Sequence, residues 1–505
     1  METGVPDRVD LLVVGGGING AGIARDAAGR GLKVLLVEQG DLGSATSSAS
    51  SKLVHGGLRY LEQFEFRLVA EALAEREILL RSAPHIVHAM RFVMPHVPAL
   101  RPAWAIRAGL LLYDYLARRQ TLAASHAIDL RQSHYAAGLK TGLTRGFVYS
   151  DCWVDDARLV VLTARAAADL GAIVLTRTAC LGAHREGARW RAILRCADGT
   201  QTEVAASALV NVTGPWARQF LLENLQLSTP FNLKLVKGSH IVVPRVYEGD
   251  HAFILQNDDR RVIFVYAYER RYTLIGTTDI ALTGPPSPCV VGAEEVSYLV
   301  SAANRYFSRQ LSAADVVWSY CGIRPLFDDG SANPSTITRD YVLRADGTPQ
   351  EAPVLSVFGG KITTHRRLAE HALEKLRPWF PGTAPAWTAR APLPGGDLPG
   401  GLESYARALA QRYPALPDNL LHSLARRHGT LCDRVIGGAH TPQDLGEHFG
   451  GDLYAREVQY FIEQEWAHSA EDVLWRRTKA GLHLTSDQAR AVARFVARRT
   501  LGAMR

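Results

Sequence analysis

Short apolar runs and an Ala-rich stretch alternate at the start of the chain. Val9–Val14 and Lys33–Val37 are continuous apolar runs, the pattern of strands that are buried on both faces of a parallel sheet. Between them, Ala21–Arg30 predicts a helix that ends near Gly31. The order strand, helix, strand predicts a βαβ unit at the N-terminus.

The later pattern is mixed, and the elements it predicts fall into three groups. Helical periodicity occurs in Phe64–Leu80, Asp155–Leu170 and Thr363–Leu376. Buried strands are predicted at Ala172–Thr176, Ala208–Thr213 and Pro353–Phe358, and strands of a second, more antiparallel sheet at Leu233–Val243, Val262–Tyr268 and Tyr272–Thr277. Residues 381–400 are rich in Pro, Gly and Ala and predict a linker, and the remainder is helical in pattern.

A glycine-rich turn follows the first predicted strand. Gly15, Gly17 and Gly20 form G-x-G-x-x-G and lead directly into the helix. The first glycine allows the tight turn, the second allows close approach to a pyrophosphate, and the third allows close packing of helix and strand. Glu38 ends the second strand, where a carboxylate accepts ribose hydroxyls. The unit predicts a bound dinucleotide; the alternative is a tight turn without a ligand.

The nucleotide-binding domain is predicted to be discontinuous. A second domain inserted between its segments would cover one face of the cofactor, which suits FAD better than NAD, since a flavin is held along its length at a domain interface. The predicted segments are 8–80, 151–230 and 346–380 for the FAD-binding domain, 81–150 for a helical insertion on the substrate side that is a candidate for membrane contact, 231–345 for the substrate domain, 381–400 for the linker and 401–505 for a C-terminal helical domain.

Composition excludes several classes of protein. The 505 residues are 47% hydrophobic and 21% charged, as in soluble globular proteins, and no apolar run reaches the ~18 residues of a membrane span. The six cysteines are scattered without C-x-x-C, which indicates a reducing compartment and argues against a zinc site or a disulfide framework. The net charge of +7 suits an acidic substrate or an anionic membrane surface, and no nucleic-acid-binding motif is present.

Several loops combine glycine with charged residues. Arg59 and Tyr60 follow the paired glycines of HGGLRY, Arg324 lies between Gly and Pro in GIRPL, and Arg339 lies in TRD. Arginine binds carboxylates and phosphates through bidentate hydrogen bonds, although each arginine alone is as compatible with a surface salt bridge. Lys361 lies at a predicted strand-to-helix junction, FGGKITT, where a helix N-terminus adds positive potential.

Three further features remain ambiguous from the residues alone. His240 in KGSH is a candidate general base, but a lone histidine is more often structural. The Ser-rich stretch 43–52 is either a flexible loop or a source of hydroxyl donors for phosphates. Arg101–Arg119, with its apolar core Ala105–Leu116, is either a buried helix or a basic, aromatic helix that lies in a membrane interface.

The motifs together resemble the FAD-dependent glycerol-3-phosphate dehydrogenases, in their bacterial, aerobic, membrane-associated form. The resemblance rests on GGGINGAGIARDAAGRGL, ATSSASSKLVHGGLRYLE, YSDCWVDDARLV, NVTGPWA, KGSHIVVPR, IGTTD, GIRPL, ITRDY and SVFGGKITT in the family's order, and on DVLWRRTKAGLHL near the C-terminus. It implies an α/β plus α fold: a Rossmann-like FAD-binding domain of the glycine-oxidase and D-amino-acid-oxidase type, a substrate domain with an antiparallel sheet, and an all-helical C-terminal domain.

The resemblance also implies an activity and its partners. The expected reaction is oxidation of sn-glycerol 3-phosphate to dihydroxyacetone phosphate by hydride transfer to flavin N5, with electrons passed to a membrane quinone. FAD is expected to be non-covalent, and the protein is expected to be a homodimer bound peripherally to an anionic membrane, at the cytoplasmic face of the inner membrane. Rival activities are a glycerol-3-phosphate oxidase that uses O₂, an FAD amine or amino-acid oxidase, and a nucleotide-binding module without turnover.

Matching motifs assign the candidate site residues. The substrate residues are Arg59, Tyr60, His240, Thr278, Arg324, Arg339 and Lys361, with His240 as the first choice of base and Arg59, Arg324 and Lys361 as further catalytic candidates. The cofactor residues are Gly15, Gly17, Ile18, Asn19, Gly20, Glu38, Gln39, Thr46, Ser47, Ser48, Ser51, Lys52, His55, Gly56, Gly57, Ala179, Thr213, Gly214, Trp216, Gly359, Gly360, Lys361 and Thr363. Two departures from the family pattern are His365, where Tyr is expected, and the segment YAYERRY.

Overall fold

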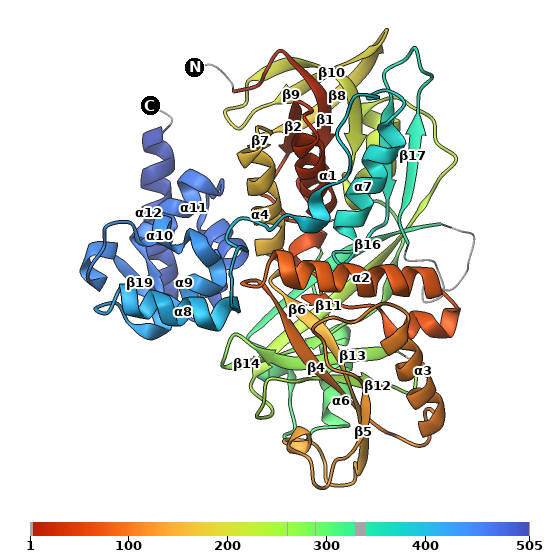
Figure 1. Ribbon diagram of the computed structural model, residues 1–505, viewed down its shortest axis with the longest axis vertical. Coiled ribbons are helices and arrows are strands. Elements are labelled where there is room, and N and C mark those ends of the chain that lie inside the picture. Colours follow the sequence, from red (N-terminus) through yellow and green to blue (C-terminus); the bar gives the residue numbers. More distant parts are fainter. Residues whose placement is uncertain (1–3, 260, 288, 329–339, 504–505) are drawn as a thin grey trace.

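The chain folds into three parts that are visible in Figure 1. The computed structural model describes residues 4–259, 261–287, 289–328 and 340–503. A mixed sheet with covering helices forms the upper part, a larger sheet with α2 and α3 forms the lower part, and a compact helical body formed by the C-terminal residues lies to one side (Figure 1).

The upper part is built on a mostly parallel sheet of eight strands. β1 (Arg8–Val14) lies at its centre and pairs in parallel with β2 and β10. Its apolar residues are buried, as expected for a strand covered on both faces. The strand order is β17-β18-β10-β1-β2-β7, and β9 joins β10 to β8. The other strands are β2 (Val34–Glu38), β7 (Ile173–Thr176), β8 (Ala179–Glu186), β9 (Arg189–Arg195), β10 (Gln201–Asn211), β17 (Val342–Asp346) and β18 (Val354–Phe358).

Three helices cover one face of this sheet. α1 (Ile18–Gly29) packs between α4 (Asp156–Asp169) and α7 (His365–Leu376). The alanines and glycines of α1 allow this close approach, and Ala21, Ala24 and Ala27 are completely buried in the shared core. The glycine turn between β1 and α1 is therefore fixed by packing on both of its sides.

The lower part is a ten-stranded sheet with the order β15-β11-β14-β13-β12-β4-β6-β3; β16 pairs with β11 and β5 with β6. Residues 87–95 and 145–154, which flank α3 (Ala103–Tyr115), are strands of this sheet. Its strands are β3 (Leu53–Val54), β4 (Val87–Pro95), β5 (His126–Asp129), β6 (Arg145–Val154), β11 (Leu233–Pro244), β12 (Ala252–Gln256), β13 (Val262–Tyr268), β14 (Tyr272–Gly276), β15 (Ile280–Leu282) and β16 (Trp318–Phe327), and α2 (Phe66–Ser82) and α6 (Ala293–Asn304) pack on it.

The C-terminal residues form a helical domain with its own apolar core. Its helices are α8 (Gly401–Arg412), α9 (Asp418–His428), α10 (Cys432–Ile436), α11 (Ala455–Gln464), the π-helix η10 (Asp472–Arg477) and α12 (Ser486–Ala503), and β19 (His448–Gly450) and β20 (Leu453–Tyr454) form a small hairpin. The predicted linker is packed: Leu393 is buried, and Trp387 Nε1 donates to the Asp26 carbonyl at 3.3 Å.

The prediction against disulfides is wrong at one position. Cys289, in the segment between β15 and α6, is bonded to Cys321 of β16. The two cysteines are 32 residues apart in the sequence, and no spacing rule shows that this segment returns along β16. The other four cysteines are free.

Candidate active site

A single large cleft, with a volume of about 1570 Å³, joins the two sheets. It is lined by the glycine turn after β1, by the loop after β2, by the segment after β3 and by residues of β16 and of the β18–α7 junction. The cleft therefore collects most of the motifs that the sequence analysis selected, from segments spread over more than three hundred residues.

The glycine turn packs against neighbouring backbone too closely for a side chain at Gly15 or Gly20. Gly15 has a φ of +121°, and a Cβ there would lie 2.5 Å from the Val212 carbonyl oxygen. A Cβ on Gly20 would lie 1.9 Å from the Gly15 carbonyl oxygen, so Gly20 packs helix against turn and does not line the cleft. The first turn of α1 contains no acidic residue, which leaves its positive end available to an anion.

Glu38 is held at the end of β2 by two backbone N–H groups. Its carboxylate accepts from Gly16 N at 2.7 Å and from Gly40 N at 2.8 Å, and Glu38 lines the cleft. Burial raises the pKa of this carboxyl, although the two hydrogen bonds act in the opposite direction. Its position matches that of a ribose-binding acid.

The Ser-rich loop turns back onto the glycine turn, as one of the two readings of the sequence requires. Ser47 Oγ accepts from Ile18 N at 3.0 Å, and Thr46 Oγ1 donates to the Ile323 carbonyl at 2.7 Å. Next to them, Asn19 Oδ1 is buried and has no hydrogen-bond partner among the described residues. A glycine cradle, a fixed carboxylate and an unpartnered amide oxygen fit a dinucleotide. We call Gly15, Gly17, Asn19 and Glu38, together with the cleft-lining residues of the loop after β2, the cofactor wall.

Arg324 of β16 is oriented by two neighbours. Its Nη1 donates to Asp279 Oδ1 at 2.6 Å, and its Nη2 donates to Thr277 Oγ1 at 3.1 Å. All three residues line the cleft. A guanidinium fixed in this way presents a preorganised positive charge to an anionic ligand.

Lys361 and Tyr60 meet in the same cleft. The Lys361 Nζ lies 3.9 Å from the centroid of the Tyr60 ring, and Arg59 lines the cleft beside Tyr60. The left-handed Gly359 and Gly360 place Lys361 at the end of β18, before α7 begins. We call Arg59, Tyr60, Thr277, Asp279, Arg324 and Lys361 the substrate wall.

His240 lies behind the substrate wall and does not line the cleft. Its side chain is 1% exposed, stacks on Tyr320 at 4.8 Å, and shares a 2.9 Å hydrogen bond between Nε2 and Ser51 Oγ. Ser51 does line the cleft. Burial, together with the charges of Arg324 and Lys52, holds the pKa of His240 well below its ordinary value, so the ring is neutral near pH 7.

The positions of the candidate residues divide into two groups. Of those predicted, the residues that line the cleft are Gly15, Gly17, Ile18, Asn19, Glu38, Gln39, Thr46, Ser47, Ser48, Ser51, His55, Gly57, Arg59, Tyr60, Thr213, Gly214, Trp216, Arg324, Gly359, Gly360, Lys361 and Thr363. Those that do not are Gly20, Lys52, Gly56, Ala179, His240 and Thr278. Arg339 lies outside the described residues.

The residues that do not line the cleft have other contacts. Lys52 Nζ is paired with Asp156 Oδ1 at 2.8 Å. Gly56 N donates to the Tyr113 hydroxyl at 2.7 Å. Thr278 Oγ1 donates to Glu295 Oε1 at 3.1 Å. These residues lie outside the cleft, and their contacts hold the segments that line it.

Sequence reasoning missed several lining residues. Trp318 and Tyr320 of β16, the disulfide Cys289–Cys321, and Trp475 and Arg476 of the C-terminal domain all line the cleft. Tryptophans and paired arginines near a C-terminus carry no signal for a site more than a hundred residues away in the sequence. Only the DVLWRRTKAGLHL motif marked that segment at all.

The two departures from the family pattern do not reach the cleft. His365 is 2% exposed and its Nδ1 is bonded to the Ile362 carbonyl at 2.8 Å. In the segment YAYERRY, Tyr266 is fully buried and its hydroxyl donates to the Ser51 carbonyl at 2.7 Å. Neither residue lines the cleft, so the departures leave the composition of both walls unchanged.

Comparison with known proteins identifies two family matches. Residues 10–366 match the FAD dependent oxidoreductase model, and residues 386–501 match the C-terminal domain of alpha-glycerophosphate oxidase. The gap between the matches, residues 367–385, covers most of α7 and the start of the packed segment before α8.

Similar proteins cover nearly the whole chain. A glycerol-3-phosphate dehydrogenase of Pseudomonas aeruginosa is 54% identical over 95% of this chain and 93% of its own length. A D-erythritol 1-phosphate dehydrogenase of Brucella abortus is 51% identical over 95% of this chain and 96% of its own. The glycerol-3-phosphate dehydrogenase of Bacillus halodurans, solved with FAD, has a TM-score of 0.78 at 27% identity and covers 98% of this chain and 91% of its own.

Proposed function

Since the chain belongs to the FAD-dependent oxidoreductases, we propose that it oxidises sn-glycerol 3-phosphate to dihydroxyacetone phosphate. The predicted fold class and cofactor are those of this family, whose members include the FAD-bound Bacillus halodurans structure. The observation that supports this activity best is the fixed Arg324, which lies in the same cleft as the glycine turn. A cation fixed beside a flavin site suits an anionic alcohol as substrate.

The cofactor wall would hold FAD through backbone and hydroxyl groups. Gly15 and Gly17 make room for the pyrophosphate, Glu38 binds the ribose, and Thr46, Ser47 and Asn19 supply side-chain contacts. Bound FAD supplies the acceptor for the hydride that leaves C2 of the substrate.

The substrate wall would bind the phosphate and orient C2. We assign the dianionic phosphate to Arg59 and to Arg339, the second of which lies outside the described residues, and the C2 oxygen to Arg324 and Lys361. Asp279 and Thr277 hold the Arg324 guanidinium in place before the substrate arrives. This preorganisation avoids a reorganisation penalty during the reaction.

Ser51 would connect the substrate hydroxyl to the buried His240. The C2 hydroxyl gives its proton to Ser51 Oγ while the Ser51 proton moves to His240 Nε2 across their 2.9 Å hydrogen bond. His240 is available as an acceptor because its lowered pKa keeps the ring neutral. The negative charges of phosphate and reduced cofactor offset the positive charge that forms on His240.

We also propose that a surface around α3 faces a membrane. α3 buries Ile106, Leu110 and Tyr113 and exposes Trp104 and Tyr115, which are 76% and 77% exposed. The helix packs beside η2 (Leu58–Gln63), which ends at the 78%-exposed Phe64. Further exposed or half-exposed members of this surface are Phe66, Arg107, Leu111, Leu112, Arg118 and Arg119.

Exposed aromatic and aliphatic residues among arginines suit an anionic bilayer surface. Across the described residues, no helix combines the length and the apolarity of a membrane span. We therefore propose peripheral binding at the cytoplasmic face of the inner membrane, quinone as the electron acceptor, and a homodimer as the working form. Phe64, the first residue of this surface, lies four residues after the cleft residue Tyr60, which supports the proposal that the substrate wall lies near the bilayer.

The activity is tested by anaerobic bleaching of the flavin band near ~450 nm on addition of sn-glycerol 3-phosphate. We expect rapid bleaching, and recovery that is fast with a soluble quinone and slow with air. Fast recovery in air would assign an oxidase. D-erythritol 1-phosphate, glycine and sarcosine are added in parallel; preferential bleaching by one of them would replace the proposed substrate.

The membrane surface is tested by flotation with vesicles that contain phosphatidylglycerol or only phosphatidylcholine. We expect binding to the anionic vesicles at low salt, and its loss in Trp104→Ser/Tyr115→Ser. The matched control is Leu170→Ser/Ile193→Ser, which changes two exposed apolar residues outside this surface. Equal binding by the two double variants would remove α3 from the docking surface.

A further inference from the structure

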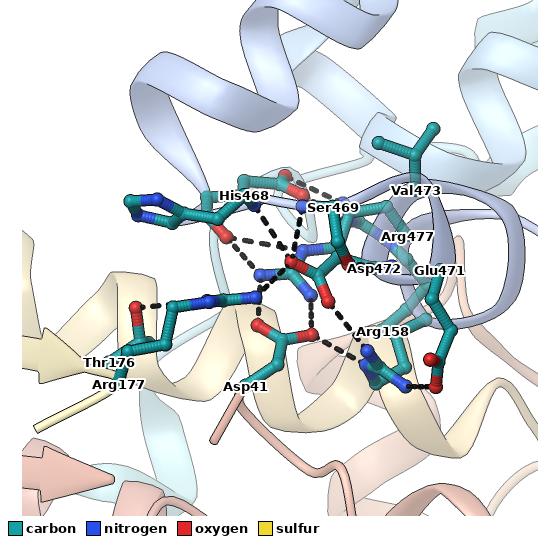
Figure 2. Close-up of polar contacts among 12 residues, drawn as sticks. Asp41, Arg158, Thr176, Arg177, His468, Ser469, Glu471, Asp472, Val473 and Arg477 are labelled. Atoms are coloured by element: carbon teal, nitrogen blue, oxygen red, sulfur yellow. Dashed lines mark hydrogen bonds and ion pairs between the residues drawn. The ribbon is translucent and has the colours of Figure 1, made fainter. Parts of the chain in front are cut away.

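A buried ion-pair network joins the C-terminal domain to the loop after β2 (Figure 2). Asp41 of this loop is 3% exposed and accepts from Arg476 Nε at 2.6 Å and from Arg477 Nη2 at 2.8 Å. Arg476 and Arg477 belong to η10 and are themselves buried. One carboxylate of the first domain thus pairs with two guanidinium groups of the C-terminal domain, and Arg476 has Asp472 as a second partner.

Asp472 completes the network from the side of the C-terminal domain. It accepts from Arg476 Nη2 at 2.6 Å and from Arg177, which follows β7. It also accepts from the backbone N–H of His468 and Ser469 at 2.7 and 2.9 Å, as Figure 2 shows. Burial favours the neutral acid, but these donors and the nearby guanidinium groups hold the pKa of Asp472 below its ordinary range.

The same loop is anchored at its other end by α4. The buried Lys52 pairs with Asp156, whose Oδ2 also accepts from Ser50 N at 3.1 Å and Ser50 Oγ at 2.7 Å. The neighbouring Asp155 pairs with Lys479 of the C-terminal domain at 3.2 Å. Both ends of the loop are therefore tied, directly or through α4, to the segment 472–479.

Between its two anchors the loop forms part of the cofactor wall. Gln39, Gly40 and Ser44–Ser51 line the cleft. None of residues 39–52 belongs to a β-strand, so sheet hydrogen bonds do not fix their position. The ion pairs at Asp41 and Lys52 supply the constraint that a strand would otherwise supply.

Burial of the charged groups makes it costly for Asp41 to leave its arginine partners. Arg477 is fully buried, and a buried guanidinium without its carboxylate is strongly disfavoured. The loop therefore keeps Asp41 beside Arg477 whenever the C-terminal domain is docked. A displaced Asp41 would leave both arginines without the acid they share.

We propose that the C-terminal domain acts as a positioning element for FAD, by holding the loop 39–52 in its cofactor-binding arrangement through Asp41. Asp41 does not line the cleft, so it acts through the loop. The inference rests on FAD as the cofactor and is independent of the substrate. It predicts that loss of the Asp41 ion pairs changes the affinity for FAD, whereas loss of a docking pair that does not reach the loop leaves it nearly unchanged.

The test compares two isosteric variants of buried interdomain ion pairs. Asp41→Asn removes the negative charge that Arg476 and Arg477 share. Glu465→Gln removes the negative charge that faces Arg158, in a pair that joins the residue after α11 to α4 with both side chains fully buried. Both proteins are stripped of FAD and titrated with FAD by fluorescence. We expect the Kd to rise at least tenfold in Asp41→Asn and less than twofold in Glu465→Gln.

Hydrogen exchange of the FAD-free proteins provides a second readout. Peptides that cover residues 40–52 are expected to exchange faster in Asp41→Asn than in Glu465→Gln, relative to the unchanged chain. If Asp41→Asn does not fold, Arg477→Lys takes its place, since it keeps the charge and loses the second hydrogen bond; we then expect at least a threefold rise in Kd. Equal Kd values and equal exchange in both variants would overturn the proposal, whatever substrate the enzyme oxidises.

Discussion

The cofactor wall and the substrate wall of one cleft are assembled in different ways. The cofactor wall begins with a continuous segment: β1, the glycine turn, α1 and β2 follow each other without interruption from Arg8 to Glu38. The substrate wall draws on four distant segments, which contribute Arg59, Asp279, Arg324 and Lys361. The glycine turn of the first is held by backbone geometry, whereas the second is held mainly by side-chain contacts such as Arg324–Asp279.

This difference separates binding of the cofactor from choice of the substrate. Backbone geometry at Gly15 tolerates no side chain, so the glycine turn of the cofactor wall is expected to fail completely or not at all. Side-chain contacts can be removed one at a time, so the substrate wall is expected to lose function in steps. The following predictions use that contrast.

The largest effect is expected from Gly15→Val. A Cβ at this position would lie 2.5 Å from the Val212 carbonyl oxygen, and the φ of +121° disfavours any side chain. We expect purified Gly15→Val to contain no FAD and to have no turnover, as measured by its absorbance spectrum. The control is Gly142→Ala, where no atom lies within 4 Å of the added Cβ; a yellow, active Gly15→Val protein would contradict the backbone account.

Arg324→Ala is expected to remove turnover and to leave FAD bound. Loss of one preorganised donor to a developing charge lowers kcat by about 10²–10³. The measurement is stopped-flow bleaching by sn-glycerol 3-phosphate together with the FAD content. The exposed Arg195 does not line the cleft, and Arg195→Ala serves as the control. Near-normal bleaching would exclude Arg324 from the reaction. Loss of FAD would show that the substrate wall also contributes to cofactor binding.

Cys289→Ser is expected to have a smaller effect that is confined to the substrate wall. The disulfide ties the segment before α6 to β16, three residues from Arg324. Without this tie the segment gains conformational freedom, and we expect KM for the substrate to rise about threefold while the affinity for FAD is unchanged. The control is Cys196→Ser, a change at a free cysteine.

A thiol titration checks the premise of this prediction. The unfolded, unreduced protein is expected to expose the four free cysteines and, after reduction, all six. Six thiols before reduction would show that the bond does not form in the purified protein, and a normal KM for Cys289→Ser would then follow.

The smallest effect concerns pH and His240. Burial lowers the pKa of His240 in the folded state below the ordinary value of 6.5. As the pH falls below about 6.5, the unfolded chain binds a proton that the folded chain does not, so this group lowers the free energy of unfolding by at most ~1.4 kcal/mol per pH unit. In His240→Asn, the decrease in the free energy of unfolding per pH unit is expected to be smaller by the contribution of one bound proton.

The measurement is urea unfolding of FAD-free protein between pH 7.5 and 5. The slope of His240→Asn is compared with that of the unchanged chain. An unchanged slope in His240→Asn would show that this ring titrates as it does in the unfolded state.

The sequence predicted the elements whose causes are local. The βαβ unit is readable because strand, turn, helix and acid are contiguous, and the predicted strand Val262–Tyr268 has the observed bounds. The helix predicted at Phe64–Leu80 is α2, at Phe66–Ser82. The division of the chain into domain segments and the roles of the site residues stay predictions.

The remaining features depend on contacts between distant segments. The sequence placed His240 among the substrate residues but could not show that Tyr320 covers it or that Ser51 stands between it and the cleft. Cys289 and Cys321 were read as scattered because their proximity arises only when β16 pairs with β11. The position of Arg476 in the cleft could not be predicted from the sequence, because its partner Asp41 lies near the other end of the chain.

The strand order of the upper sheet has a consequence for synthesis of the protein on the ribosome. β1 forms its parallel pair with β10, and β10 pairs with β18, which ends at Phe358. At about 5–20 residues per second, β18 is translated roughly 20–70 s after β1. The edge of β1 is uncovered until β10 is made, and the edge of β10 is uncovered until β18 is made, so newly made chains are exposed to aggregation. We therefore expect translation rate and chaperone supply to set the yield of active enzyme in cells.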